Sequence, residues 1–237
     1  MEIIIKQQNG ENDILTFRRI RKAIGVLGVS LPLILWLFSN IAFFETSLQE
    51  SISHYYYTNL REIFTGVLCA VGLFLIRYKG HTHKNFFKND SALTNLAGTT
   101  AFGVALIPTN PINCADKTDT LLPFCLDWLG WIHYGFAAVF FLALSIIAIN
   151  VFTIGQEKNE EIPISMWNEN HIYKTCGYLM LLFLVLTPIC GYFKCFRYST
   201  LIFEALMLFA FGTAWLIKGR VLGDKGVIGK KLYREVH

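Results

Sequence analysis

Long runs of apolar residues, separated by short polar segments, dominate the hydrophobic pattern of the chain. Neither the 3.6-residue stripe of a soluble amphipathic helix nor the two-residue alternation of a strand governs these runs. A helix needs about 20 apolar residues to cross the hydrocarbon core of a bilayer. Six segments approach or exceed this length, at residues 24–44, 59–76, 91–108, 128–154, 173–193 and 199–217. The pattern predicts an all-α, polytopic integral membrane protein with a bundle of six transmembrane helices.

The polar segments outside these runs are short, so we expect a single membrane domain over residues 23–218. It would be preceded by a short, disordered cytoplasmic segment at 1–22 and followed by a basic cytoplasmic tail at 219–237. The first apolar run is too long for a cleavable signal peptide and lacks a small-residue cleavage site. In the third run, Ala97, Ala101 and Ala105 form a small-residue face that favours close helix packing.

Composition agrees with a membrane protein, because 54% of the residues are hydrophobic and only 16% are charged, against about 25% charged in soluble domains. The distribution of positive charge predicts the orientation. Of the 21 Lys and Arg residues, only Arg61, Lys117, Lys194 and Arg197 lie opposite the N-terminal side. Cytoplasmic loops carry the excess of such residues, so both termini are expected in the cytoplasm, in the inner (plasma) membrane of a bacterium. The net charge of +4 is thus an orientation signal, and we expect no nucleic-acid partner.

Four cysteines lie in the two segments predicted to face outward, where disulfides persist. Cys114 and Cys125 are in one segment, and Cys190 and Cys195 are in the other. The simplest pairing staples each segment separately, although four cysteines allow three pairings. Structural zinc sites usually pair their ligands at C-x2-4-C, and neither spacing fits this pattern convincingly. A reactive C-x-x-C pair is not found either, so we expect structural disulfides and no metal.

Two ionisable residues interrupt the apolar runs and are candidates for function, because charged groups in hydrocarbon are costly. His133 and Glu204 each lie about 8 Å inside the outer end of their helices, at 1.5 Å per residue. Arg61 would join them near the head groups, because the uncharged part of the second run is too short to span alone. At the inner depth we expect only un-ionised polar residues, such as Asn95 and Asn150.

These residues suggest a catalytic or binding site in a polar cavity that opens to the outer face. Glu204 would hydrogen-bond His133 and fix its tautomer, and His133 would act as a general acid or base. Arg61 would hold an anionic group. The entrance and rim would be lined by His54, Tyr55, Tyr56, Tyr57, Asp127 and Arg197. The structural alternative is that these ionisable residues only hold helices together and that the tyrosines belong to the interfacial belt.

Three functions remain open at this point. The first is binding or processing of a lipid head group or small amphiphile at the outer face, with membrane lipids as partners. The second is a non-enzymatic membrane scaffold or accessory subunit, and the third is a proton-coupled small-molecule transporter. Whether the protein is an enzyme stays open. The tail sequence RVLGDKGVIGKK lacks the glycine spacing of a phosphate-binding loop, and we expect no cofactor.

Overall fold

The computed structural model describes residues 2–78, 80, 82–111, 120–122, 126–154, 168–223 and 232, with the side chains of all of these except 2–14 and 127. Within these residues all the regular elements are helical. The six α-helices are α1 (Glu2–Phe38), α2 (Arg61–Arg77), α3 (Asp90–Leu106), α4 (Asp127–Ile146), α5 (Glu169–Phe193) and α6 (Ser199–Lys218). Shorter helical turns are η1 (Ala42–Phe44), η2 (Ser53–Tyr57), η3 (Phe86–Lys88) and the π-helical η4 (Ile147–Val151), which continues α4.

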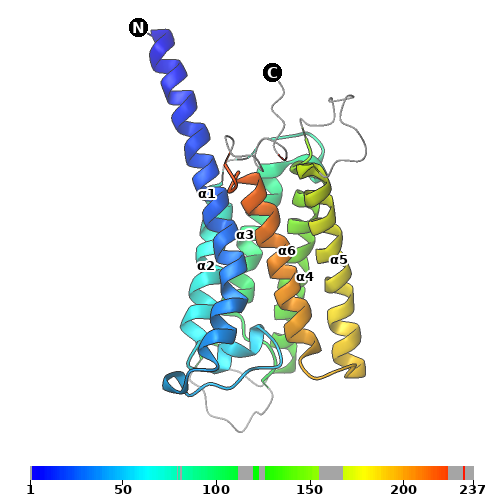
Figure 1. Ribbon diagram of the computed structural model, residues 1–237. Helices are drawn as coiled ribbons and strands as arrows, with labels where there is room; N and C mark the ends of the chain where they lie inside the picture. The colour runs from blue at the N-terminus through cyan, green and yellow to red at the C-terminus, as the bar shows by residue number, and fades with distance from the viewer. Residues whose placement is uncertain are drawn as a thin grey trace.

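The six α-helices run side by side in one bundle (Figure 1). We call the end at which α1 enters and α6 leaves the terminal end, and the end with η2 and the α5–α6 turn the loop end. The first part of α1 projects beyond the bundle at the terminal end (Figure 1). Within the bundle α6 packs against α1 and α5, and α3 packs against α2 and α4.

Four of the helices are long and apolar enough to cross a membrane: Leu15–Phe38, Trp128–Val151, Glu169–Phe193 and Ser199–Lys218. This confirms the all-helical membrane class predicted from the apolar runs. Helices α2 and α3 have 17 residues each. At 1.5 Å per residue each is about 26 Å long, slightly less than the ~30 Å hydrocarbon core.

Helix α1 differs from the expected first span at both ends. It begins at Glu2, so the segment expected to be disordered is helical, and no proline interrupts residues 2–22. It ends at Phe38, before the predicted boundary. There the Ser39 hydroxyl donates to the Leu35 carbonyl and the Asn40 amide donates to the Trp36 carbonyl, each at 2.6 Å. These bonds satisfy carbonyls that the end of a helix leaves unpaired.

Small residues bring neighbouring helices close together. Ala97, Ala101 and Ala105 are all fully buried, so the predicted packing face of α3 is confirmed. Gly72 of α2 and Gly98 of α3 face each other so closely that a Cβ built at either position would lie within 2.9 Å of the other's carbonyl oxygen. The helix backbones themselves are therefore in contact, as expected where small residues face each other in membrane bundles.

Candidate functional site at the loop end

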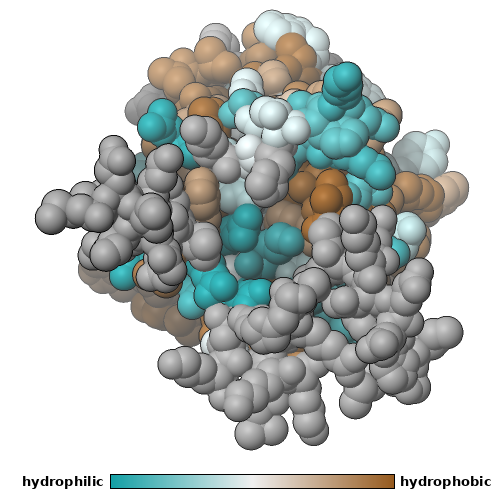
Figure 2. Space-filling view, turned by 90° about the horizontal axis from the view of Figure 1, so that it is seen from above, coloured by the Kyte–Doolittle hydropathy of each residue, from teal (hydrophilic) through white to brown (hydrophobic). Residues whose placement is uncertain are grey.

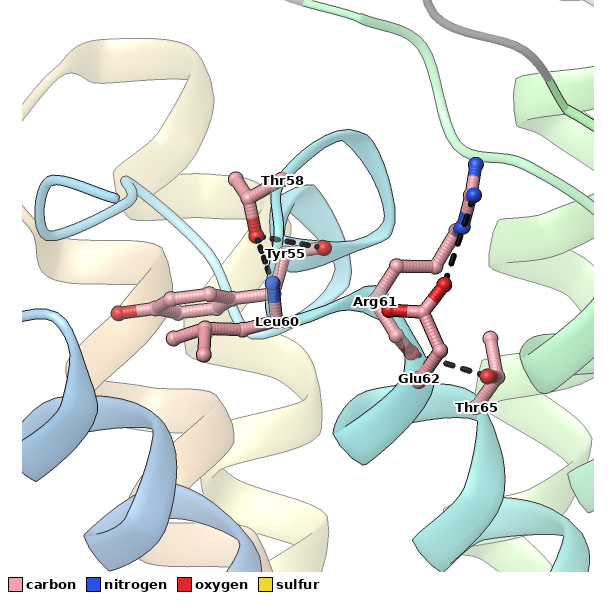
Figure 3. A network of polar contacts seen from close by, with 6 residues as sticks. All are labelled: Tyr55, Thr58, Leu60, Arg61, Glu62 and Thr65. Atoms are coloured by element: carbon pink, nitrogen blue, oxygen red, sulfur yellow. Dashed lines mark hydrogen bonds and ion pairs between the residues drawn. The ribbon is translucent and has the colours of Figure 1, made fainter. Parts of the chain in front are cut away.

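The segment from Ile52 to Thr58, which we call the plug, closes the loop end of the bundle. It contains the 3-10 helix η2, in which Ser53, Tyr55 and Tyr56 are buried. The turn after η2 is fixed by Thr58, whose hydroxyl donates to the Tyr55 carbonyl at 2.9 Å and accepts the Leu60 N–H at 3.2 Å (Figure 3). The plug therefore leads directly into the first turn of α2.

The three tyrosines of the plug each reach a different part of the bundle. The Tyr55 hydroxyl lies 2.6 Å from that of Ser39 at the end of α1. The Tyr56 hydroxyl donates to the carbonyl of Leu106, and the Tyr57 hydroxyl donates to that of Thr109, beyond α3. Burial raises the pKa of all three phenols, which keeps them protonated as donors. Predicted as the lining of an entrance, these side chains lie in the structure as tethers.

His133 is 1% exposed and is held at both ring nitrogens. Nδ1 lies 2.7 Å from the carbonyl oxygen of Ile107, and Nε2 lies 3.0 Å from the hydroxyl of Ser53. A carbonyl only accepts, so Nδ1 carries the proton and Nε2 of the neutral ring accepts from the Ser53 hydroxyl. The Ile107 carbonyl therefore sets the tautomer that the sequence analysis assigned to Glu204.

Glu204 reaches the plug from α6. Its carboxylate accepts the N–H of Ile52 at 2.6 Å and also that of Ser53. In the opposite direction, the N–H of Leu201 in α6 donates to the carbonyl of Glu50 at 2.9 Å. Ser53 thus joins the two predicted site residues, because its N–H bonds Glu204 and its hydroxyl bonds His133. The structure brings this pair together through the plug, not by a direct hydrogen bond.

Arg61 begins α2, and the interactions described for it follow its own helix. Its guanidinium lies 3.5 Å from the carboxylate of Glu62, and its carbonyl accepts from the Thr65 hydroxyl at 2.9 Å. Figure 3 shows the Tyr55 ring pointing toward α1 and the Arg61 side chain pointing the other way, toward the chain that follows α3. Arg61 is therefore on a different side of the plug from the bond between Tyr55 and α1.

The other predicted rim residues are dispersed. One ring nitrogen of His54, Nδ1, is buried without a hydrogen-bond partner among the described residues, and burial lowers the pKa of this side chain. Asp127 is the first residue of α4, and its side chain lies outside the described part. Arg197 is exposed, with its guanidinium 4.9 Å from the centre of the Tyr198 ring.

The structure tests one of the two predicted disulfides. Cys114 and Cys125 lie outside the described residues. Cys190 and Cys195 are free thiols in the structure, so the predicted bond between them is not present. The turn after α5, in which the Cys195 N–H donates to the Cys190 carbonyl at 3.1 Å, brings the two side chains only into hydrogen-bonding contact.

The contacts of Ser53 resemble a nucleophile beside a base, with Ile107 orienting the base. The remaining geometry is unfavourable for acyl transfer, which needs N–H donors free to stabilise an oxyanion. The backbone N–H groups beside the Ser53 hydroxyl, those of Ile52 and Ser53, both donate to the Glu204 carboxylate. The arrangement therefore holds the plug. Among the described residues no three His, Cys, Asp or Glu side chains lie close enough to hold a metal ion.

An apolar groove of about 250 Å³ lies beside the plug, between α1 and α6. Its walls come from Pro32 to Trp36 of α1 and from Leu201 to Phe209 of α6, and its loop-end wall comes from Leu48, Ile52 and Tyr55. Sequence reasoning missed this groove, because its apolar residues look like any other lipid-facing positions.

At the terminal end the structure buries charged groups that the sequence analysis counted with the loops. Asp90 is 3% exposed and Glu169 is 6% exposed. Arg21 and Lys218 approach them from α1 and α6. In the sequence, the signal for this burial was the position of these residues at the ends of the apolar runs. Asp90 and Glu169 are the first residues of α3 and α5, and Lys218 is the last residue of α6, so these groups lie at the end of the bundle and the prediction for its inner half stays untested.

The long apolar helices and the buried polar tethers define the chain as a helical membrane protein. No protein-family model matches it, and no curated protein or solved structure shows significant similarity to it. The function has to be inferred from the geometry alone.

Proposed function

We propose that the protein binds an amphiphile in the outer leaflet, with an acyl chain in the groove between α1 and α6. The groove itself is the observation that carries this proposal. Its lining is almost entirely apolar and it is open on one side, with Trp36 58% exposed and Ile202 43% exposed beside it. The occupant that fits an apolar recess within a membrane-spanning region is a hydrocarbon chain.

The length of the groove supports an acyl chain. Along α6 the groove runs from Leu201 to Phe209, which is about 12 Å at 1.5 Å per residue. Its deep end is about 15 Å from the start of the helix at Ser199, half of the ~30 Å hydrocarbon core. The groove therefore reaches to about the depth of one leaflet, and the plug limits it at the head-group level.

Arg197 is suited to hold the polar head of this amphiphile. It lies in the turn that precedes α6, four residues before Leu201, the first groove residue of that helix, and its side chain is exposed. A guanidinium binds phosphate or carboxylate through two parallel hydrogen bonds, so the preferred ligand would carry an anionic head group. Binding is the whole of the proposed activity, with no bond made or broken.

The proposal includes the orientation of the chain. All six helices would cross the inner (plasma) membrane of a bacterium, with both termini in the cytoplasm and the loop end outside. The excess of Lys and Arg on the terminal side supports this arrangement. Helices α2 and α3 pack along the others over most of the bundle (Figure 1), and a shortfall of a few ångströms is accommodated by local thinning of the bilayer.

A scaffold or accessory subunit is the second candidate. It is favoured by the tethers, because Ser53, His133 and Glu204 bond to one another or to backbone groups. The transporter alternative has less support. Between the two ends the core is filled by buried apolar side chains, among them Phe64, Leu68, Phe140, Leu144 and Phe211.

Photocrosslinking with a diazirine-bearing anionic phospholipid tests the proposal on the full chain in nanodiscs. Ala205→Trp fills the groove and should reduce crosslinking at least several-fold, and Arg197→Gln should weaken the preference for anionic over neutral lipid. Leu182→Trp is the matched control, because it adds the same ring to an exposed position on α5 and should change nothing. Equal crosslinking of the wild type and Ala205→Trp would overturn the proposal.

A further inference from the structure

The segment between α2 and α3 carries two exposed phenylalanines at the terminal end of the bundle. Phe86 is 48% exposed and Phe87 is 55% exposed, and both belong to the 3-10 helix η3. Their rings meet edge to face, with the ring centres 5.8 Å apart. Leaving phenyl rings in water forgoes the free energy of burying them, so an apolar environment for this pair would be stabilising.

Hydrogen bonds within the segment hold η3 in this position. The Asn85 side chain accepts the Phe87 N–H at 2.9 Å, and the Asn85 N–H donates to Nδ1 of His83 at 2.9 Å. The Asn89 side chain donates to the His83 carbonyl at 3.0 Å, and its oxygen accepts the Ala92 N–H at 3.0 Å, which caps α3. The exposure of the two rings is therefore a property of a well-defined turn.

The position of η3 along the bundle is at the level of a membrane surface. Taken as membrane-spanning helices, α2 and α3 are each only about 26 Å long. They are too short to carry the segment between them far beyond a ~30 Å hydrocarbon core. In addition, η3 packs against η4, the last part of the candidate span Trp128–Val151. Both observations favour a position for Phe86 and Phe87 where head groups meet acyl chains.

The charged side chains of this segment are positive. Lys84 and Lys88 lie on either side of the two rings in the sequence and are exposed, and residues 77–89 contain no Asp or Glu. The next residue, Asp90, is 3% exposed, and a Cβ built on Gly80 would lie 2.4 Å from its carboxylate. Because the chain covers this carboxylate, the surface that η3 presents outward is apolar and cationic.

We propose that η3 and the two lysines form an anchor that binds the anionic phospholipids of the leaflet at the terminal end. The phenyl rings would enter the boundary between head groups and acyl chains, as apolar residues of interfacial segments do. Lys84 and Lys88 would lie among the lipid phosphates. Figure 2 looks onto this end and shows hydrophobic side chains (brown) at the rim beside hydrophilic ones (teal). The rings bind any phospholipid, and the two charges select an anionic one.

Photocrosslinking of the full chain in nanodiscs locates the two rings. Replacing Phe86 or Phe87 by p-benzoylphenylalanine keeps an aromatic side chain and should give lipid adducts, which mass spectrometry detects. The same probe in place of Leu182, which is exposed on the candidate span of α5, is the positive control. In place of Gln8, which precedes the candidate span of α1 by seven residues, it should give few adducts.

Competition between two lipids tests the lysines. In discs with equal amounts of phosphatidylglycerol and phosphatidylcholine, adducts at Phe87 should be enriched in phosphatidylglycerol by about threefold or more. Lys84→Gln with Lys88→Gln should bring the ratio of adducts close to the ratio of lipids in the disc. Arg19→Gln with Lys174→Gln is the matched control, because it removes two exposed charges elsewhere at the terminal end and should leave the enrichment unchanged.

Any of three results would overturn the inference. The first is a lack of lipid adducts at Phe86 and Phe87 when Leu182 gives them, which would mean that η3 faces water or a protein partner. The others are a lack of enrichment in phosphatidylglycerol and an equal enrichment in the lysine variants and the control pair. Both leaflets of a disc have the same lipids, so the outcome depends neither on the orientation of the chain nor on the groove between α1 and α6.

Discussion

Glu204 shows how a single charged residue is accommodated in an otherwise apolar helix. Its carboxylate accepts two backbone N–H groups of the plug, from Ile52 and Ser53. These hydrogen bonds pair buried backbone donors with the carboxyl oxygens, which offsets part of the cost of placing a polar group in the bundle. His133 is accommodated in a different way, because its neutral ring is hydrogen-bonded at both nitrogens.

Replacing Glu204 should therefore destabilise the protein according to how many acceptors remain. Glu204→Ala leaves both plug N–H groups unpaired and should lower the free energy of unfolding by about 1–3 kcal/mol. Glu204→Gln keeps one oxygen acceptor and should cost less. Glu62→Ala, at a side chain that is 74% exposed, should change stability by less than about 0.5 kcal/mol. Denaturant or thermal unfolding in detergent measures all three, and equal losses at Glu204 and Glu62 would contradict the tether.

Sequence reasoning found His133 and Glu204 because an ionisable residue inside an apolar run is conspicuous. It missed Ser53, their shared partner, because a serine in a polar segment carries no such signal. It also missed that Arg21 and Lys218 approach the buried carboxylates of Asp90 and Glu169, because each cation was counted with the loop beside it. Burial of these residues follows from neighbouring helices, which the local sequence does not reveal.

At the level of elements, the contact between α1 and α6 forms the groove and depends on glycines. A Cβ built on Gly212 would lie 2.5 Å from a side-chain carbon of Val29 and 2.7 Å from the carbonyl oxygen of Gly25. The two backbones approach so closely that only glycine fits. The distance between α1 and α6, and with it the width of the groove, is therefore set at this contact.

Gly212→Ala should push α1 and α6 apart and destabilise the protein by about 1–3 kcal/mol, as overpacking typically does. Gly135→Ala provides the matched control on α4, because a Cβ there meets nothing within 4 Å. It should be neutral or stabilising by up to about 1 kcal/mol, since alanine is the better helix former. Unfolding temperatures of the two variants measure the difference, and indistinguishable values would show that the close contact is unimportant.

The plug is an element that its own sequence did not predict. The sequence SISHYYYTN suggested either an interfacial belt or the lining of a cavity. In the structure, side chains of the plug form hydrogen bonds with residues at the loop end of α1, α3 and α4. A side chain of α6, that of Glu204, accepts from the backbone of the plug. Tyrosine is amphipathic and serves either purpose. Only the positions of its acceptors distinguish a lining from a tether.

For the whole molecule, the proposed orientation makes a labelling prediction. In single-cysteine variants, Cys195 at the loop end is exposed and should react with a membrane-impermeant maleimide in intact cells. A cysteine introduced by Arg19→Cys at the terminal end should react only after the membrane is permeabilised. Labelling of both sites in intact cells, or of Arg19→Cys alone, would contradict the orientation with cytoplasmic termini.

The sequence by itself determined that the protein is a helical membrane protein and where its apolar helices lie, because helix length and hydropathy are local properties of the chain. It also marked His133 and Glu204 as unusual. The tertiary structure decided their partners, which are 80 residues away for the bond from His133 to Ser53 and 152 for that from Glu204 to Ile52. Hydrogen bonds across such separations, the groove, and the approach of Arg21 and Lys218 to the buried carboxylates of Asp90 and Glu169 exist only once the helices have packed.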